Sequence, residues 1–260
     1  MLTKTVPIPA LTGTYDNYIW ITHDRENAIV VDPGDAAPVL EYLQKNQLNL
    51  CAILITHRHN DHIAGISKLV EVYNTRVYGP RSELIPGITD VVTEGNVVKI
   101  QELALQFDVI SIPGHLPDHL AYIGNGGVFC GDVLFGCGCG KMFIGTPEEF
   151  HHSLQRLAAL PANTHVYCAH EYTESNIRFA LLCEPDNIEL QQRQLDAAAL
   201  RAQDLPTLPS SIALERATNP FMRCGQNAII ANVSKQLNLS PPPSNEVEVF
   251  AALRSWRDQF

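Results

Sequence analysis

Short apolar runs separated by turns dominate the first half of the chain. Residues 1–35 alternate apolar and polar positions in strand fashion, and the runs 17–21 and 28–31 on either side of a polar turn at 24–27 predict two paired strands. Residues 37–47 have helical spacing and lead into the apolar run 52–55, which predicts a strand-helix-strand unit. Further strands are expected at 77–78, 91–92, 97–100, 105–110 and 121–123, and further helices at 63–74 and 148–159. This pattern indicates two sheets packed face to face with helices outside, a four-layer αββα sandwich of the α/β (α+β) class.

The pattern changes after residue 173. Strand signals end there, and helical spacing follows at 174–182, 188–203, 211–216 and 245–256. The run Ser240-Pro241-Pro242-Pro243-Ser244 predicts a rigid connector, with Ser244 as the N-cap of the last helix. We therefore expect an αβ catalytic domain at 1–173 and a small all-helical, substrate-binding domain at 174–260. The second domain is short for independent stability, so we expect it to dock on the first.

The densest group of potential metal ligands directly follows the apolar run 52–55. It is the stretch Thr56-His57-Arg58-His59-Asn60-Asp61-His62. His57 and His59 are two residues apart, so in an extended chain they project to the same side. Asp61 and His62 are adjacent where the next helix begins, so their side chains diverge and suit a second centre. Mixed imidazole and carboxylate ligands favour zinc, iron or manganese over calcium, and zinc takes about four ligands, so others must come from elsewhere in the chain.

This stretch resembles the Thr-His-x-His-x-Asp-His signature of the metallo-β-lactamase superfamily. Its later ligands have counterparts here in Pro113-Gly114-His115, Gly131-Asp132 and Ala169-His170. The resemblance implies two metal ions, with His57, His59 and His115 on one, Asp61, His62 and His170 on the other, and Asp132 as the bridge. It also implies that Asp32, in the turn after the strand 28–31, lies near the metal loop.

Several further motifs are similar to one family within that superfamily, glyoxalase II. They are Gly138-Cys139-Gly140-Lys141, His170-Glu171-Tyr172-Thr173, Asn219-Pro220-Phe221-Met222-Arg223 and Arg257-Asp258-Gln259-Phe260. That family hydrolyses S-D-lactoylglutathione to D-lactate and glutathione, the second step of methylglyoxal detoxification. The resemblance implies two divalent ions, with zinc preferred and iron or manganese as alternatives. A hydroxide between the ions, next to Asp61 and Asp132, would attack the thioester.

Glutathione carries two carboxylates, so a chain of net charge -10 needs a local cationic patch to hold it. The glyoxalase II resemblance implies that the substrate contacts are Lys141, Phe143, His170, Tyr172, Arg254 and Arg257. Arg254 and Arg257 are three apart in the last predicted helix, so they share a face. The chain departs from the family pattern at Leu116-Pro117-Asp118, and at Phe143, where some relatives have tyrosine.

The composition limits which kinds of partner and which cellular compartment are expected. A net charge of -10 argues against nonspecific nucleic-acid binding, which depends on Lys and Arg at the phosphates. No segment approaches the roughly 18 apolar residues of a membrane-spanning helix. The seven cysteines are odd in number and lack framework spacing, which suits a reducing cytoplasm. We expect a cytoplasmic monomer, and the role of Cys137 and Cys139, which could form a metal or redox pair, stays open.

Three other functions compete with thioester hydrolysis. A persulfide dioxygenase resembles this family but uses one iron held by two histidines and one aspartate, so the seven candidate ligands favour two metals. A β-lactam hydrolase would not need Lys141 or the C-terminal helices. A non-catalytic metal-binding module is disfavoured because structural zinc sites are usually closed and rich in cysteine. Counting metals per chain and assaying a glutathione thioester would separate these functions.

Overall fold

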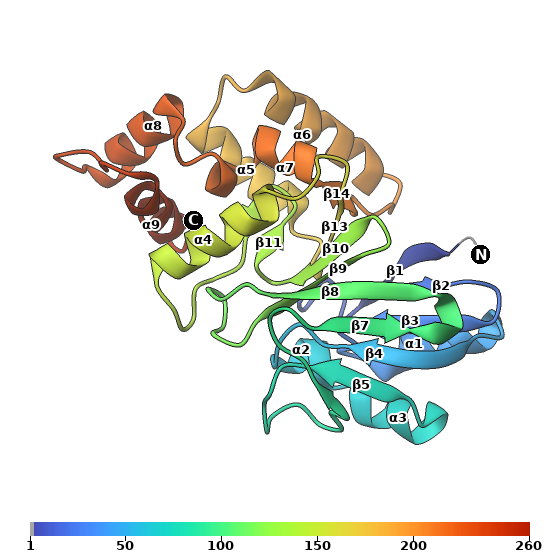
Figure 1. The fold of residues 1–260 in the computed structure, drawn as a ribbon. Coiled ribbons are helices and arrows are strands. Elements are labelled where there is room, and N and C mark those ends of the chain that lie inside the picture. Colours follow the sequence, from blue (N-terminus) through green and yellow to red (C-terminus); the bar gives the residue numbers. More distant parts are fainter. Residues whose placement is uncertain (1–2) are drawn as a thin grey trace. The chain divides into compact units, whose positions relative to one another are not determined.

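The structure is a computed structural model that describes residues 3–260 (Figure 1). Its strands are β1 (Lys4–Ala10), β2 (Asn17–His23), β3 (Asn27–Val31), β4 (Asn49–Leu54), β5 (Arg76–Gly79), β6 (Asp90–Val91), β7 (Val97–Ile100), β8 (Leu105–Ser111), β9 (Leu120–Gly124), β10 (Gly127–Gly131), β11 (Leu134–Phe135), β12 (Gly138–Cys139), β13 (His165–Cys168) and β14 (Ser210–Ser211). Its helices are α1 (Ala36–Lys45), α2 (Asn60–Ile63), α3 (Ile66–Tyr73), α4 (Pro147–Ala158), α5 (Thr173–Cys183), α6 (Ile188–Arg201), α7 (Ile212–Thr218), α8 (Asn227–Leu237) and α9 (Glu246–Arg257), with 3-10 turns η1 (Gln101–Leu103) and η2 (Pro220–Met222).

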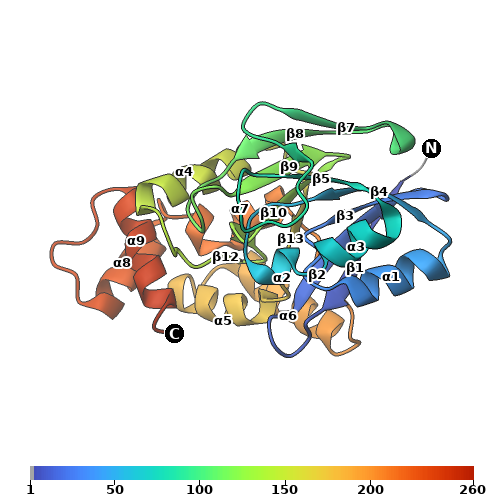
Figure 2. The same ribbon diagram turned by 90° about the horizontal axis from the view of Figure 1, so that it is seen from below.

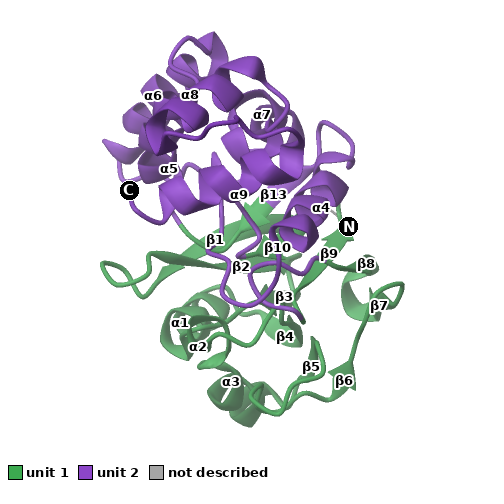
Figure 3. Cartoon of the chain, turned by 90° about the vertical axis from the view of Figure 1, so that its left-hand side faces the viewer, with its two compact units in different colours: residues 1–111, 118–131, 167–170 green, residues 112–117, 132–166, 171–260 purple. Residues whose placement is uncertain are grey.

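The described chain divides into two compact units (Figure 3). Unit 1 holds residues 3–111, 118–131 and 167–170, and unit 2 holds residues 112–117, 132–166 and 171–260. Within residues 3–260, none of the helices has the length and apolar character needed to cross a bilayer.

The first sheet of unit 1 is built from β1 to β6 in chain order. Strands β1, β2 and β3 are antiparallel, and β3 to β6 are parallel. The expected pairing of β2 with β3 and the expected helix before β4 are confirmed. Helix α1 packs against β1 and α3 packs against β4, and Figure 2 shows α1 and α3 side by side over this sheet. Because β3 and β4 are parallel neighbours, the segments that follow them emerge at the same edge.

The second sheet has the strand order β14-β13-β10-β9-β8-β7. Strands β8 and β10 are both antiparallel to β9, so they run in the same direction and end at the same edge. The segments leading to His115 and Asp132 follow β8 and β10. The topology of this sheet therefore explains why residues far apart in the chain could serve one site.

The core of unit 1 has two parts. One buried cluster packs Val39 and Leu43 of α1 and Leu69 of α3 against the first sheet. The other part consists of contacts between the two sheets. The Trp20 ring of β2 meets the Tyr167 ring of β13 at 4.8 Å between centroids, and the indole nitrogen donates to the Cys168 carbonyl at 2.9 Å. Tyr122 of β9 is fully buried, and its hydroxyl donates to the Ile55 carbonyl at 2.8 Å. Burial raises the pKa of Tyr122 well above its usual value, so the hydroxyl remains a donor. These two hydrogen bonds tie the sheets together through groups that would otherwise be buried without partners.

Unit 2 is organised around a chain of buried aromatic rings. Phe250 of α9 lies 5.4 Å from Phe150 of α4 and 5.9 Å from Phe221 of η2, between ring centroids. Phe221 in turn stacks on Phe179 of α5 at 6.0 Å. Aromatic rings bury large areas and contribute about 0.5–1.5 kcal/mol per pair beyond that burial. These rings therefore join helices that are widely separated in the sequence.

Helix α8 was not predicted. Its sequence is rich in asparagine and β-branched residues, which have modest helix propensity. Ile229 and Val233 are buried and lie four residues apart, so one face packs inward. Tertiary packing of this face, rather than local propensity, accounts for the helix.

Two other expectations were wrong in detail. The helix expected at 63–74 is broken into α2 and α3 around Gly65, because the Gly65 nitrogen donates to the Pro33 carbonyl at 2.8 Å. The N-cap of α9 is Asn245, whose side chain accepts from the Glu248 nitrogen, and not Ser244. Ser244 instead donates its backbone nitrogen to the Glu248 carboxylate at 2.7 Å, so it extends the cap by one residue.

Gly34, in the turn after β3, generates a stability prediction. A Cβ built there would lie 1.8 Å from the Asp61 carbonyl oxygen, so the turn and the metal loop are in direct backbone contact. We expect Gly34→Ala to lower the free energy of unfolding by about 2–3 kcal/mol, because the metal loop must shift to relieve the overlap. Denaturant unfolding of the metal-free protein measures this change.

Gly126→Ala is the control for that experiment. Gly126 lies in the turn between β9 and β10 with a φ of +75°, and nothing lies within 4 Å of a Cβ built there. Its substitution should cost only about 1 kcal/mol of backbone strain. Equal losses in the two variants would show that the contact with Asp61 is not what requires Gly34.

Candidate metal centre

A buried carboxylate anchors the metal loop, residues 56–62. Asp32 follows β3 and Thr56 follows the neighbouring parallel strand β4, so both emerge at the same edge of the sheet. Asp32 is 5% exposed and accepts from the Thr56 nitrogen at 2.8 Å and from the Thr56 hydroxyl at 2.6 Å. Its Oδ2 also lies 3.1 Å from Nδ1 of His62. One carboxylate thus fixes both ends of the loop, and its place beside the loop agrees with the expectation for Asp32.

Asp61, His62 and His170 form a compact group of donors in unit 1. Their donor atoms lie within 4.8 Å of one another. Asp61 Oδ2 is 3.4 Å from His62 Nε2 and 3.6 Å from His170 Nε2. The structure therefore brings together the three residues expected to hold one of the two ions.

Asn17, which the sequence did not single out, orients this group. It is 3% exposed, and its side-chain nitrogen donates to both the carbonyl and the carboxylate of Asp61 at 3.2 Å and 3.1 Å. Asn17 also forms a β-bridge with His170, and Nδ1 of His170 lies 2.7 Å from the Tyr15 carbonyl. Asn17 is 44 residues from Asp61, so no local pattern could have indicated it.

His115 and Asp132 form a pair of neighbouring potential ligands in unit 2. His115 Nε2 lies 3.6 Å from Asp132 Oδ2, and both residues are buried. Nδ1 of His115 lies 2.8 Å from the Lys141 carbonyl. A Cβ at Gly140 would lie 1.9 Å from the Asp132 carbonyl, so only glycine allows this close approach of the two segments.

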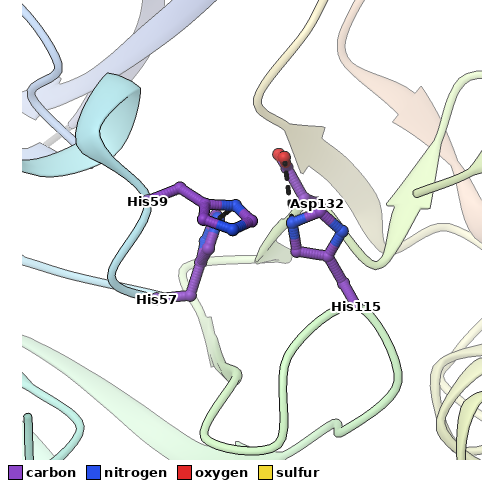
Figure 4. A group of neighbouring side chains, drawn as sticks. All are labelled: His57, His59, His115 and Asp132. Atoms are coloured by element: carbon purple, nitrogen blue, oxygen red, sulfur yellow. Dashed lines mark hydrogen bonds and ion pairs between the residues drawn. The ribbon is translucent and has the colours of Figure 1, made fainter. Parts of the chain in front are cut away.

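His57, His59, His115 and Asp132 also form a group whose donor atoms lie within 4.8 Å of one another (Figure 4). The dashed lines in Figure 4 mark the contact of His57 with His59 in unit 1 and that of His115 with Asp132 in unit 2. The remaining group, Asp32, His57 and His62, shares members with the others and includes the carboxylate that anchors the loop. All seven residues expected as metal ligands therefore fall within these groups.

The hydrogen bonds at Nδ1 show that the imidazoles suit a metal. Nδ1 of His115 and Nδ1 of His170 each face a backbone carbonyl, and Nδ1 of His62 faces the Asp32 carboxylate. An acceptor at Nδ1 favours the tautomer with its proton on that atom, which leaves the lone pair of Nε2 for a metal. Together with the carboxylates of Asp61 and Asp132, these donors fit a divalent metal site.

Of the expected substrate residues, Lys141 and Phe143 contact His115 within unit 2, and Tyr172 packs elsewhere in that unit. The Phe143 ring is 56% exposed and meets the His115 ring edge-on at 5.2 Å between centroids. The Lys141 ammonium is exposed and lies 5.6 Å from the centre of the Phe143 ring. The Tyr172 ring meets the ring of Phe135 at 5.4 Å. The segment 141–143 thus presents a cation and an aromatic face directly after the Gly140 contact.

The two arginines of α9 differ in their surroundings. Arg254 is 6% exposed and donates to the Cys139 and Gly140 carbonyls, both at 3.2 Å, so it holds the segment that precedes Lys141. Arg257 is half-buried between aromatic rings, and its Nη2 lies 3.4 Å from the side-chain oxygens of Ser175 and Asn176. Burial and then the neighbouring Arg254 lower the pKa of Arg257. A nearby anion would act in the opposite direction, because it favours the charged form of the guanidinium.

Cys137 and Cys139 are packing residues. Both are buried, and burial raises the pKa of the Cys137 thiol to about 12 and that of the Cys139 thiol to about 11. The Cys137 thiol donates to the Thr218 carbonyl at 3.3 Å, and Cys139 accepts from Arg254. In the described part of the chain, neither belongs to a group that could hold a metal ion.

The fold and the site define a member of the metallo-β-lactamase superfamily, a four-layer αββα fold that here carries a C-terminal helical domain. Residues 11–170 match the family model described as "Metallo-beta-lactamase superfamily", and residues 171–260 match "Hydroxyacylglutathione hydrolase C-terminus". The crystal structure of ETHE1 from Myxococcus xanthus is similar, with a TM-score of 0.64, 25% identity, and coverage of 99% of this chain and 98% of that one.

Curated relatives narrow the family further. The chain is 50% identical over 257 residues to the hydroxyacylglutathione hydrolase of Methylobacillus flagellatus, covering 99% of each protein. It is 49% identical over 247 residues to that of Nitrosomonas eutropha, covering 94% of this chain and 95% of the relative. The chain therefore belongs to the hydroxyacylglutathione hydrolase family, also called glyoxalase II.

The contacts of Asp32 generate a prediction about metal binding. We expect Asp32→Asn to weaken metal affinity by about 10–100-fold, because the amide cannot accept from both Thr56 and His62 as the carboxylate does. Competition against a chromophoric chelator measures the affinity of the metal-free protein.

Asp24→Asn is the matched control for Asp32→Asn. Asp24 is also a buried turn carboxylate of unit 1, and it accepts from the Glu26 and Asn27 nitrogens at 2.8 Å. Its loss should lower stability and leave metal affinity unchanged. Equal metal affinity in the two variants would contradict the anchoring role of Asp32.

Proposed function

We propose that the chain hydrolyses S-D-lactoylglutathione to D-lactate and glutathione, the second step of methylglyoxal detoxification. The observation that carries this proposal is the coexistence of the clustered His and Asp donors with a C-terminal domain of the hydroxyacylglutathione hydrolase type. The relatives of about 50% identity that share both parts carry that enzyme name. Substrate chemistry and residue roles follow from this assignment.

The donor groups support two divalent ions per chain. His57, His59 and His115 would hold one ion, Asp61, His62 and His170 the other, and Asp132 would bridge them. Zinc is preferred for this mixture of imidazole and carboxylate, with iron and manganese as alternatives. When bound, such ions lower the pKa of a coordinated water to about 7 and polarise a carbonyl oxygen.

The chain's own residues hold and orient the reacting groups. The carboxylates of Asp61 and Asp132 would act as ligands of the proposed ions, and these ions would supply the attacking hydroxide. The carbonyls that accept from His115 and His170 keep each Nε2 directed inward. The leaving group is a thiolate with a solution pKa of about 8.5, so it departs without a dedicated general acid.

Glutathione recognition would fall to Lys141, Phe143, His170, Tyr172, Arg254 and Arg257. The exposed Lys141 ammonium can pair with a glutathione carboxylate, and the Phe143 ring offers an apolar face without a hydroxyl. Arg257 would contribute directly, and Arg254 through the Cys139 and Gly140 carbonyls that it holds. This division follows from the burial of Arg254.

The alternative of a mononuclear iron persulfide dioxygenase has less support. A single iron would need one group of ligands. The described residues offer a second: one group contains His115 and Asp132, and the other consists of Asp61, His62 and His170. We further propose a catalytic domain at 1–173, a substrate-binding domain at 174–260, and a monomer in the cytoplasm. One chain supplies every proposed ligand and substrate contact, which supports action as a monomer.

The first test is hydrolysis of S-D-lactoylglutathione by the purified protein, followed by release of free thiol. We expect turnover with this substrate and a metal content that approaches two ions per chain by elemental analysis. A fully active protein with one ion would contradict the two-metal assignment. If the protein holds its metals but releases no thiol, the proposal that it hydrolyses this thioester is wrong.

The second test separates chemistry from substrate capture. We expect Asp132→Ala to lower kcat by about a hundredfold or more, because it removes the proposed bridge. Lys141→Ala should raise KM by about tenfold with little change in kcat, because a charge-assisted hydrogen bond to substrate is lost. The same variant should act normally on a small thioester without the glutathione carboxylates.

Lys99→Ala is the control for Lys141→Ala. Lys99 is an exposed lysine of β7 in unit 1. Lys99→Ala removes one positive charge, as Lys141→Ala does, but it does not alter the proposed substrate contacts. Its KM should therefore match that of the parent protein. A KM increase of the same size would assign the effect to overall charge rather than to a contact.

A further inference from the structure

Residues 118–120 pair one for one with residues 56–58, in opposite directions. The Leu120 nitrogen donates to the Thr56 carbonyl at 2.9 Å. The His119 ring stacks on the His57 ring, with centroids 4.6 Å apart and an interplanar angle of 18°. The Arg58 guanidinium donates to the Asp118 carboxylate. Three kinds of contact thus join two three-residue segments in antiparallel register, and all six residues belong to unit 1.

The pairing is anchored at its inner end by the two sheets. Thr56 follows β4 of the first sheet, and Leu120 begins β9 of the second. Gly131, at the end of β10 with a φ of +48°, closes over it, since a Cβ there would lie 2.3 Å from the Thr56 hydroxyl and 2.8 Å from the His119 ring. Burial decreases from Thr56 and His119, which are fully buried, to Arg58 and Asp118, whose side chains are 23% and 24% exposed. The ion pair is therefore the outer end of the pairing.

Arg58 lies between two proposed metal ligands in the sequence. The His57 ring packs against the rings of His119 and His62, whose centroids lie 4.6 Å and 4.1 Å away. The His59 ring meets it edge-on at 4.8 Å and is the outermost of these rings in the loop. A contact that fixes Arg58 therefore restrains the backbone on both sides, at His57 and at His59.

We propose that Arg58 and Asp118 are positioning residues that close the outer end of this pairing and hold His57 and His59 ready for a metal ion. The inference rests on the proposed metal centre, and it adds two residues that are not among the proposed metal ligands or substrate contacts. It gives Asp118, in the segment Leu116-Pro117-Asp118 that departs from the family pattern, a function in this chain. Without the ion pair, the loop would lose its restraint at the point farthest from the sheets.

Metal affinity of the metal-free protein, measured by chelator competition with Zn²⁺ or Co²⁺, tests the proposal. We expect Arg58→Gln and Asp118→Asn each to weaken affinity by about threefold to tenfold, because the pair is partly exposed to solvent. The double variant should lose no more than either single variant, since both remove the same contact. The charge swap, Arg58→Asp with Asp118→Arg, should recover part of the loss.

Arg76 and Asp90 provide a matched control. They form an ion pair of the same two residue types in unit 1, with Nε of Arg76 3.0 Å from Asp90. Arg76→Gln and Asp90→Asn should leave metal affinity unchanged. If the control variants weaken metal binding as much as Arg58→Gln, the effect is general charge loss and the proposal is overturned.

The readouts separate this inference from the proposed function. Metal affinity is measured without substrate, so failure to hydrolyse the thioester would overturn the function and leave this result standing. Parent-like affinity in both Arg58→Gln and Asp118→Asn would overturn the positioning role alone. In metal-saturated protein we expect KM for the glutathione thioester to stay unchanged, and a KM increase in Arg58→Gln would instead make Arg58 a substrate contact. If Arg58→Gln does not fold, Arg58→Lys, which keeps the charge but not the forked geometry, gives the same comparison.

Discussion

The site depends on one buried carboxylate. Asp32 has left the sheet at the end of β3 with a φ of +51°, and its oxygens accept from Thr56 and face His62. A carboxylate that is 5% exposed must be matched by donors, and the metal loop supplies them. The parallel pairing of β3 and β4 makes this possible, because it places the two loops beside each other. The sheet therefore determines where the ligands can be, and Asp32 determines how they point.

Backbone contacts orient the proposed ligands that lie outside the metal loop. Carbonyls of Tyr15 and Lys141 face Nδ1 of His170 and His115. Glycines at 34, 65 and 140 let main chains approach where any side chain would collide. A main-chain carbonyl has no side-chain rotamers, so it orients a ligand more rigidly than a flexible side chain can. The described site is accordingly rich in contacts from glycine turns and strand ends.

The sequence predicted the parts whose signals are local. The metal loop is a compact motif, β2 and β3 are apolar runs on either side of a polar turn, and the change to helices after residue 173 is visible in composition. The contacts of Asn17 with Asp61 and of Arg58 with Asp118 join residues 44 and 60 positions apart, and nothing in either segment marks its partner. The burial of Arg254 could not be predicted either. Its spacing indicates a helix face, but it does not show that this face contacts the Cys139 and Gly140 carbonyls. Helix α8 was missed because packing of Ile229 and Val233 outweighs weak local propensity.

The burial of the cysteines has a consequence for a protein that works beside a thiol product. Thiolates, not thiols, attack disulfides, so exchange with oxidised glutathione requires an ionised and accessible sulfur. Six of the seven cysteines are buried, and burial raises the pKa of the partly exposed Cys51 as well. At neutral pH, a thiol with a pKa of about 12, as for Cys137, is almost entirely protonated. The chain can therefore work in a glutathione pool of changing redox state without forming mixed disulfides at these buried positions.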